Sequence, residues 1–164
     1  MPVKRLVIIA ACALAGFGIY RLAMLFVPEE TRIRQLMETM VEAFNDRDAG
    51  DCAAGLADDF REETVKLGKP EVHALLVHLF FAQRDSRTGE VPYRIEVPPE
   101  SLRVTLGPGG GEAKVELIAR FLEDRGKGAR PVWEAAISAD IVKVDGEWRV
   151  KRSSHESASG KRPF

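Results

Sequence analysis

Apolar residues recur at helical spacing between residues 33 and 44 of the chain. Large side chains occupy i, i+3, i+4 and i+7 positions, which is the pattern of an amphipathic helix that buries one face. They are Ile33, Leu36, Met37, Met40, Val41 and Phe44. Pro28 and the two glutamates after it favour a helix start, because proline fits the first turn and carboxylates favour the positive end of the helix dipole. We therefore predict that the folded domain opens with a helix that ends near Asn45.

Two further helices are predicted in the N-terminal half. Asp46 to Asp51 is rich in turn-forming residues, and Cys52 to Ala57 then predicts a short second helix. Arg61 to Leu67 reads as an extended piece. Gly68-Lys69-Pro70 interrupts the chain, and apolar residues at helical spacing predict a third helix after it. These residues are Val72, Leu75, Leu76, Leu79 and Phe80.

From Val91 onward apolar residues alternate with polar ones, which is typical of β-strands. The glycine-rich run 107–111 and Asp145-Gly146 are typical of hairpin turns. Short connections predict an antiparallel sheet, so the fold class is α+β, with three N-terminal helices packed on a curved antiparallel sheet. The predicted strands cover residues 91–97, 102–106, 112–123, 133–144 and 147–154. The domain is predicted to span 29–156, with a flexible polar tail at 157–164.

The N-terminal residues predict a membrane anchor that precedes this domain, within residues 1–28. Leu6 to Val27 carries a single charge, Arg21, and as a helix it is long enough to cross the hydrocarbon core. Lys4 and Arg5 precede it, which favours a cytoplasmic N-terminus. For a bacterial chain we therefore expect a single-pass inner-membrane protein with an extracytoplasmic domain.

Two processing signals compete with an uncleaved anchor. Ala13-Leu14-Ala15 resembles a signal-peptidase site, and Ile9-Ala10-Ala11-Cys12 resembles a bacterial lipoprotein box. Cleavage at either place would leave an apolar stretch, Gly16 to Val27, with nothing to cover it. The uncleaved anchor is therefore favoured.

Composition and charge argue against several classes of function. The 24 Lys and Arg residues nearly balance the 25 Asp and Glu residues, so no strong basic field predicts binding to nucleic acid. Cys12 and Cys52 fall in the predicted anchor and the predicted domain, so neither a disulfide framework nor a thiol metal site is expected. The glycines at 107–111 lack the lysine of a phosphate loop, and no cofactor is predicted.

The histidines do not form a recognisable metal motif. His73 and His78 share the predicted third helix but lie on different faces, whereas paired zinc ligands usually sit four residues apart. His155 would join them only if the fold brought it close. We therefore predict no metal site.

Several short motifs resemble those of a known superfamily. They are Ala43-Phe44-Asn45, the acidic turn that follows, Ala57-Asp58-Asp59-Phe60, and the terminal run Asp145 to Val150. With three helices before a meander of long strands, the chain from about Glu29 to its end resembles the nuclear transport factor 2-like superfamily, which includes SnoaL-like proteins and ketosteroid isomerases. In that cone-shaped fold the sheet curls around the first helix. The resemblance implies that this helix forms one wall of a pocket.

The resemblance also places three residues at positions that ketosteroid isomerases use for catalysis. Met40 matches the tyrosine of the first helix, Thr64 the general-base aspartate, and Asp140 the proton-donating aspartate late in the sheet. A thioether cannot donate a hydrogen bond and an alcohol is a weak base, so the isomerase mechanism is not carried over. Asp140 remains a candidate acid if it faces the pocket, and is ordinary surface charge if it faces solvent. The predicted pocket residues are Met37, Met40, Phe44, Thr64, Ser138 and Asp140.

Three functions remain open. The favoured one is a membrane-anchored, non-catalytic domain that binds a small apolar ligand in the cone. The second is an assembly scaffold that pairs with another copy through its sheet, similar to the type IV secretion assembly factors. The third is an isomerase, dehydratase or cyclase that uses Asp140, with His73 as a secondary candidate. An open pocket would favour binding or catalysis, whereas a filled cone with an apolar outer sheet face would favour assembly.

Overall fold

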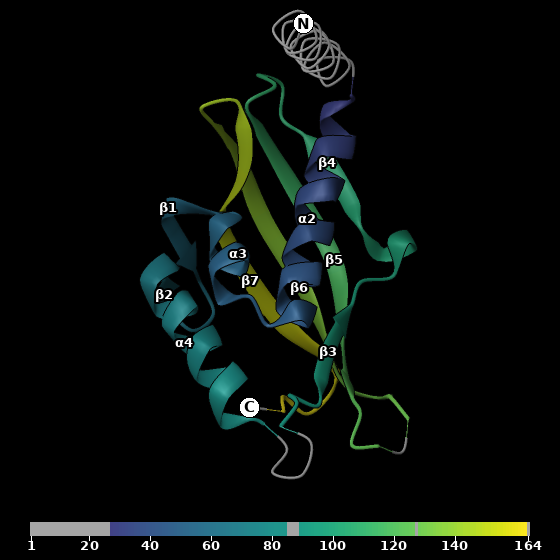
Figure 1. The fold of residues 1–164 in the computed structure, drawn as a ribbon. Coiled ribbons are helices and arrows are strands. Elements are labelled where there is room, and N and C mark those ends of the chain that lie inside the picture. Colours follow the sequence, from purple (N-terminus) through teal and green to yellow (C-terminus); the bar gives the residue numbers. More distant parts are fainter. Residues whose placement is uncertain (1–26, 85–88, 127, 164) are drawn as a thin grey trace, which may run out of the picture.

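Helices cover the concave face of a strongly curved sheet (Figure 1). The computed structural model describes residues 27–84, 89–126 and 128–163. Its helices are α2 (Glu29–Asp46), α3 (Ala49–Ala54) and α4 (Lys69–Ala82), with a 3₁₀ turn at Pro99–Ser101. Its strands are β1 (Leu56–Glu62), β2 (Leu67–Gly68), β3 (Tyr93–Glu96), β4 (Arg103–Leu106), β5 (Glu112–Glu123), β6 (Arg130–Val144) and β7 (Glu147–Gly160).

The strands form one sheet in the order β2-β1-β7-β6-β5-β3, and β4 also pairs with β5. Strands β5, β6 and β7 make the predicted antiparallel meander, and Asp145 and Gly146 turn its last hairpin with positive φ angles of 51° and 83°. The prediction of a wholly antiparallel sheet is wrong at one pair, because β1 and β7 run parallel. The two strands lie at opposite ends of the domain sequence, so no short connection dictates their relative direction.

The second helix is shorter than predicted. It ends at Ala54, and Leu56 already begins β1, pairing with Val150 of β7. Leu56, Ala57 and Phe60 are buried in this strand. Tertiary pairing and burial therefore outweigh the local helix preference of the alanine-rich run.

The apolar stripe of the first predicted helix forms the centre of the core, as expected. Ile33 of α2 is fully buried, and Met37 and Phe44 are buried on the same face. The concave face of the sheet packs against it through alternate residues of β5 and β6, as the period-two pattern predicts. Among these, Val115 and Ile141 are also fully buried.

The C-terminal end of α2 is fastened to β3. The side-chain amide of Asn45 donates to the carbonyl of Ile95 and accepts from its N–H, at 2.9 and 2.8 Å. Arg47, in the left-handed region at φ 66°, donates to the carbonyls of Val91 and Tyr93 at 2.8 and 2.7 Å. Its other terminal nitrogen donates to two carbonyls at the end of α2. This end of the helix therefore fixes where β3 begins.

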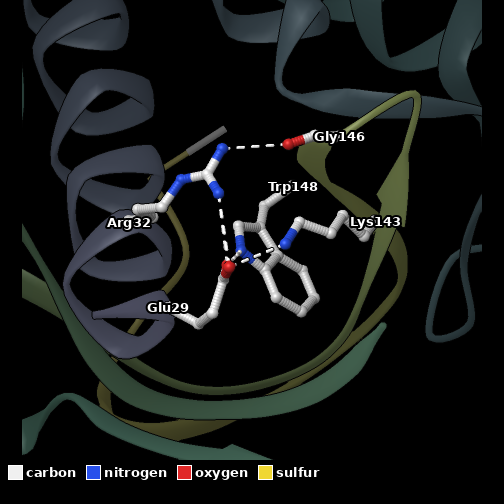
Figure 2. A network of polar contacts seen from close by, with 5 residues as sticks. All are labelled: Glu29, Arg32, Lys143, Gly146 and Trp148. Atoms are coloured by element: carbon white, nitrogen blue, oxygen red, sulfur yellow. Dashed lines mark hydrogen bonds and ion pairs between the residues drawn. The ribbon is translucent and has the colours of Figure 1, made fainter. Parts of the chain in front are cut away.

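The opposite end of α2 is held against the β6–β7 hairpin by Glu29 (Figure 2). The Glu29 carboxylate accepts hydrogen bonds from Lys143 Nζ at 2.7 Å and Trp148 Nε1 at 2.6 Å, and Arg32 lies within 3.3 Å. Arg32 also donates to the carbonyl of Gly146 at 2.9 Å. The hydrogen bond from Lys143 is the main reason that the pKa of Glu29 lies below its ordinary value.

Replacing Glu29 with glutamine is expected to cost about 1 kcal/mol of stability near neutral pH. The estimate is modest because 34 % of the Glu29 side chain is exposed and solvent screens its ion pairs. Since folding lowers this pKa, the contribution is present above the ordinary carboxyl pKa and disappears as the pH falls through the folded value. Urea unfolding of both proteins at pH 7 and pH 3 measures it. A stability difference that did not shrink at pH 3 would contradict the ionic explanation.

Of the two ends of the chain, only the C-terminal one lies mostly within the described residues. The predicted membrane segment, Leu6 to Val27, lies outside the described residues apart from Val27, so it stays a prediction. In the part of the chain that is described, no helix is both long and apolar enough to cross a membrane. At the C-terminal end, β7 continues to Gly160 and pairs with Trp133 of β6. The sheet therefore extends past the predicted domain boundary at residue 156.

Candidate functional site

An apolar cavity of about 260 Å³ lies between the helices and the concave face of the sheet. Met37, Met40 and Phe44 of α2, all predicted pocket residues, form one wall. The facing sheet contributes Leu117, Ala119, Phe121, Ile137 and Ala139, and α4 contributes Val72 and Leu76. The alanines leave space that larger residues would fill, and the methionines can adapt to a guest.

A second apolar cavity, of about 220 Å³, continues the first beneath α4. The two share lining residues, among them Phe44, Leu76 and Phe121. Helix α4 packs mainly on α3, β1 and β2 (Figure 1). Its residues Leu75, Leu76 and Leu79 line the second cavity. Leu75, on the lining, is 41 % exposed. Because this second cavity adjoins the first and is open to solvent beside Leu75, we call it the mouth.

A carboxylate and an imidazole face each other at this mouth. His155 Nδ1 lies 2.9 Å from Glu62 Oε1, and the two side chains are only 19 % and 12 % exposed. The parallel β1–β7 pair brings them together, because it sets Glu62 beside Ser153. Both residues line the mouth cavity.

The position of His155 is fixed from several sides. Thr64 Oγ1 accepts from the His155 N–H at 2.9 Å and donates to its carbonyl at 3.2 Å. The Trp133 ring stands edge-on to the imidazole, with centroids 5.9 Å apart. Within the described ranges no side chain or backbone group hydrogen-bonds to the other ring nitrogen, Nε2, and that atom is not closed off from solvent. Nε2 is therefore available to a bound molecule.

Three of the predicted pocket residues do not line the apolar cavities. Asp140 is exposed and lies on the outer face of the sheet, opposite Lys114 and Arg152 in register. Ser138 lines a hollow on that same outer face, because it shares the alternation of Asp140 rather than that of Ile137 and Ala139. Thr64 is exposed and hydrogen-bonds to the backbone of His155 instead.

The remaining titratable candidates are poor reactive groups. His73 and His78 are exposed on α4. Among the described residues no cluster of His, Cys, Asp or Glu side chains could hold a metal ion. Cys52 lines the apolar cavity, but burial raises the pKa of its thiol to about 11, so it stays protonated and unreactive near neutral pH.

Sequence reasoning missed the Glu62–His155 pair. The predicted last strand ended at Ser154. Glu62 fell in the predicted extended piece from Arg61 to Leu67, for which no partner strand was predicted. The alternation that buries Trp148 and Val150 was the available signal for the last strand, but a register shift between β6 and β7 interrupts it before His155. The pairing of β1 with β7 has no local sequence signal.

The outer face of the sheet carries ion pairs between neighbouring side chains. Lys114 and Glu116 of β5 form an ion pair of 3.2 Å, and Arg120 of β5 pairs with Glu134 of β6 at 2.8 Å. A hollow of about 450 Å³ on this face is lined by polar side chains such as Arg103, Glu116 and Ser138 together with apolar ones such as Ile118 and Ala136.

A larger hollow, of about 600 Å³, lies beside the end of α2 and contains several arginines. Arg47 uses its guanidinium on backbone carbonyls, and Arg125 pairs with the buried carboxylate of Glu123 at 2.8 Å. Glu90 and Asp124 also line it. The charges of this hollow therefore largely serve the fold, and the apolar cavities are the better candidate site.

Comparisons with known proteins identify the fold. No family model matches the chain, and no curated protein matches its sequence. In structure it is similar to a nuclear transport factor 2-like protein with a cystatin-like fold from Novosphingobium aromaticivorans, with TM-score 0.65 and 16 % identity over 87 % of this chain and 89 % of that one. It is also similar to Aln2 from a Streptomyces species, with TM-score 0.65 and 15 % identity over 79 % of this chain and 91 % of that one.

A third similar structure is a candidate scytalone dehydratase from Novosphingobium aromaticivorans, with TM-score 0.62 and 17 % identity over 80 % of this chain and 85 % of that one. At such identities the likeness shows the fold alone. The predicted nuclear transport factor 2-like cone is confirmed for the domain. The predicted anchor before it has no support from these structures.

Proposed function

We propose that the domain binds a small, mostly apolar molecule inside its cone, and that residues 6–27 hold it at a membrane. The apolar cavity between α2 and the sheet is the observation that carries this proposal. Ligand sites in proteins are typically apolar, with a few polar groups that orient the guest. The cavity and its mouth, at about 260 and 220 Å³, suit a guest below the size of most drugs.

The outer sheet face argues against the alternative of an assembly scaffold. Pairing of two sheets would bury the ion pairs Lys114–Glu116 and Arg120–Glu134, and the cost of desolvating such charges can exceed what their attraction returns. The open cone and the ion pairs of the outer face together favour binding. The third alternative, catalysis through Asp140, loses its support because that carboxylate lies on the outer face.

Filling the cavity with a larger side chain from the sheet is expected to abolish binding of an apolar probe. Ala139 is buried on β6 and lines the cavity, so Ala139→Phe places a ring in the space that a guest would occupy. The probe is N-phenyl-1-naphthylamine, detected by energy transfer from tryptophan, since Trp133 lines the mouth. We expect affinity to fall at least about tenfold, which corresponds to about 1.4 kcal/mol.

Ala136→Phe is the matched control, because Ala136 lies on the same strand and lines the outer hollow. Both variants are compared with the parent as full chains in the same detergent, so the probe dissolved in micelles contributes equally. Thermal unfolding checks that overpacking has not disrupted the Ala139→Phe protein. Equal probe binding by all three folded proteins would exclude the cone as the binding site.

A further inference from the structure

The outward face of α4 exposes apolar side chains that the described part of the domain leaves uncovered. Val77 and Phe81 are 38 and 68 % exposed, and the small residue Ala74 is also exposed. The inner face of the helix is apolar as well, because Leu79 and Phe80 are buried there. A helix that is apolar all round is normally covered on every side. A second partner for α4 is therefore expected.

Ala74, Val77 and Phe81 follow the spacing of a coiled-coil seam, and we call them the α4 stripe. Intervals of three and four residues align them along one side of the helix, as at the a, d and a positions of a heptad. A stripe of this kind packs against a similar stripe on a second helix. We propose that two copies of this chain associate through the α4 stripe, with their α4 helices side by side and parallel.

The residues around the α4 stripe suit a second copy of the same helix. Residues 72–82 contain no Lys, Arg, Asp or Glu, so pairing two copies brings no like-charged residues of these types together. In a parallel pair, the residue just before an a position lies beside the residue five positions further along on the partner helix. His73 and His78 have this spacing, so the histidines of one copy would lie beside those of the other, where imidazoles can hydrogen-bond to each other.

The parallel direction follows from the membrane tether, and in this respect the inference rests on the proposed function. Only Pro28 separates the predicted anchor, which ends at Val27, from the start of α2 at Glu29. Both α2 and α4 run away from that end of the domain (Figure 1). Two copies tethered in one bilayer therefore present their α4 helices in the same direction. An antiparallel pair would place the two anchors on opposite sides of the dimer.

The small size of the α4 stripe sets the expected strength of the pairing. A standard stable interface buries about 1,600 Å² in total, which is more than a pair of 14-residue helices is expected to bury. The pairing is therefore expected to be weak in dilute solution. Two copies held in one membrane pair more readily, because tethering raises their effective concentration.

Disulfide trapping of the full-length chain in lipid vesicles tests the pairing and its direction. Ala74→Cys is introduced into a Cys12→Ser background, in which the remaining Cys52 is buried. A high ratio of lipid to protein keeps random encounters rare. In a parallel pair the two introduced thiols face each other, so mild oxidation is expected to convert most of the chain to a disulfide-linked dimer, measured by non-reducing gel electrophoresis.

Leu106→Cys in the same background is the matched control, since Leu106 is an exposed apolar residue on β4. It is expected to give at least about fivefold less dimer, because thiols that do not face each other cannot be bridged.

Phe81→Glu, added to the Ala74→Cys protein, provides a second test. A carboxylate in the α4 stripe would be buried against its copy, so trapping is expected to fall at least about fivefold. Because Phe81 is largely exposed within one copy, the thermal unfolding of the domain is expected to change little. Leu106→Glu in the same protein is expected to leave both trapping and unfolding unchanged.

Four outcomes would overturn this inference. If folded Ala74→Cys gives no more dimer than Leu106→Cys, the α4 helices do not pair in parallel. If Phe81→Glu leaves trapping unchanged, the α4 stripe is not the contact. If a dye attached at position 74 is shielded by vesicles while no dimer forms, lipid covers this face instead. A chain that does not float with the vesicles would remove the tether and, with it, this pairing.

The binding of N-phenyl-1-naphthylamine tests the ligand site separately. The α4 stripe lines neither the apolar cavity nor its mouth, so Phe81→Glu is expected to leave probe affinity within about twofold of the parent. Failure of the pairing therefore leaves the proposed ligand site intact, and failure of probe binding leaves the trapping result unaffected.

Discussion

Replacing Ile141 with alanine is expected to lower the free energy of unfolding by about 3 to 4 kcal/mol. Ile141 is fully buried on β6, in the same core cluster as Ile33 and Val115. The shorter side chain loses its transfer free energy and leaves a void that the paired strands on both sides cannot close. Urea unfolding followed by tryptophan fluorescence measures the loss, since Trp148 lies in the same cluster.

Val144→Ala is the control for this substitution, on the same strand. Val144 is 45 % exposed, so its truncation removes little buried surface and is expected to cost under about 0.5 kcal/mol. If the two variants were equally stable, the concave face of β6 would not be the core face.

Replacing Arg47 with alanine is expected to cost about 2 to 3 kcal/mol, more than ordinary arginine substitutions. The guanidinium satisfies four backbone carbonyls, two on the β3 side and two at the end of α2. Without it those acceptors lose charge-assisted hydrogen bonds, which are stronger than neutral ones. Arginine and alanine both carry a Cβ atom, so the left-handed backbone at φ 66° costs both proteins alike and the expected loss comes from the hydrogen bonds.

Arg94→Ala controls for the loss of a nearby positive charge. Arg94 is exposed, and none of the described residues forms a hydrogen bond or ion pair with its side chain, so a change within about 0.5 kcal/mol is expected. Arg47→Lys keeps the charge but not the planar fork, and is expected to recover only part of the stability. Full recovery by lysine would mean that charge alone, rather than the four directed hydrogen bonds, makes Arg47 important. Urea unfolding of the three variants provides the comparison.

Features encoded by local periodicity could be read from the sequence. The helical spacing from Ile33 to Phe44 located α2 and its buried face, and the two-residue period located β5 with its boundaries. The resemblance to nuclear transport factor 2-like proteins placed Met40 at the cavity wall. Each of these depends on residues close together in the chain.

Features that depend on distant segments could not be read in the same way. The parallel pairing of β1 with β7 joins opposite ends of the domain, and the Glu62–His155 pair exists only because of it. For Asp140 the local pattern was right and the resemblance was misleading. The resemblance suggested a pocket residue, whereas its alternation with Ile141 already placed it on the other face of β6.

The Asn45 amide that binds Ile95 also has a consequence for solubility. An outer strand presents unpaired N–H and C=O groups that another chain can extend into intermolecular β-structure. On β3 the Asn45 side chain occupies both groups of Ile95, as an incoming strand would. At the opposite edge, β2 has only two residues, Leu67 and Gly68, too few to template a fibril. A single amide on the first helix thus helps to keep this sheet from recruiting copies of itself.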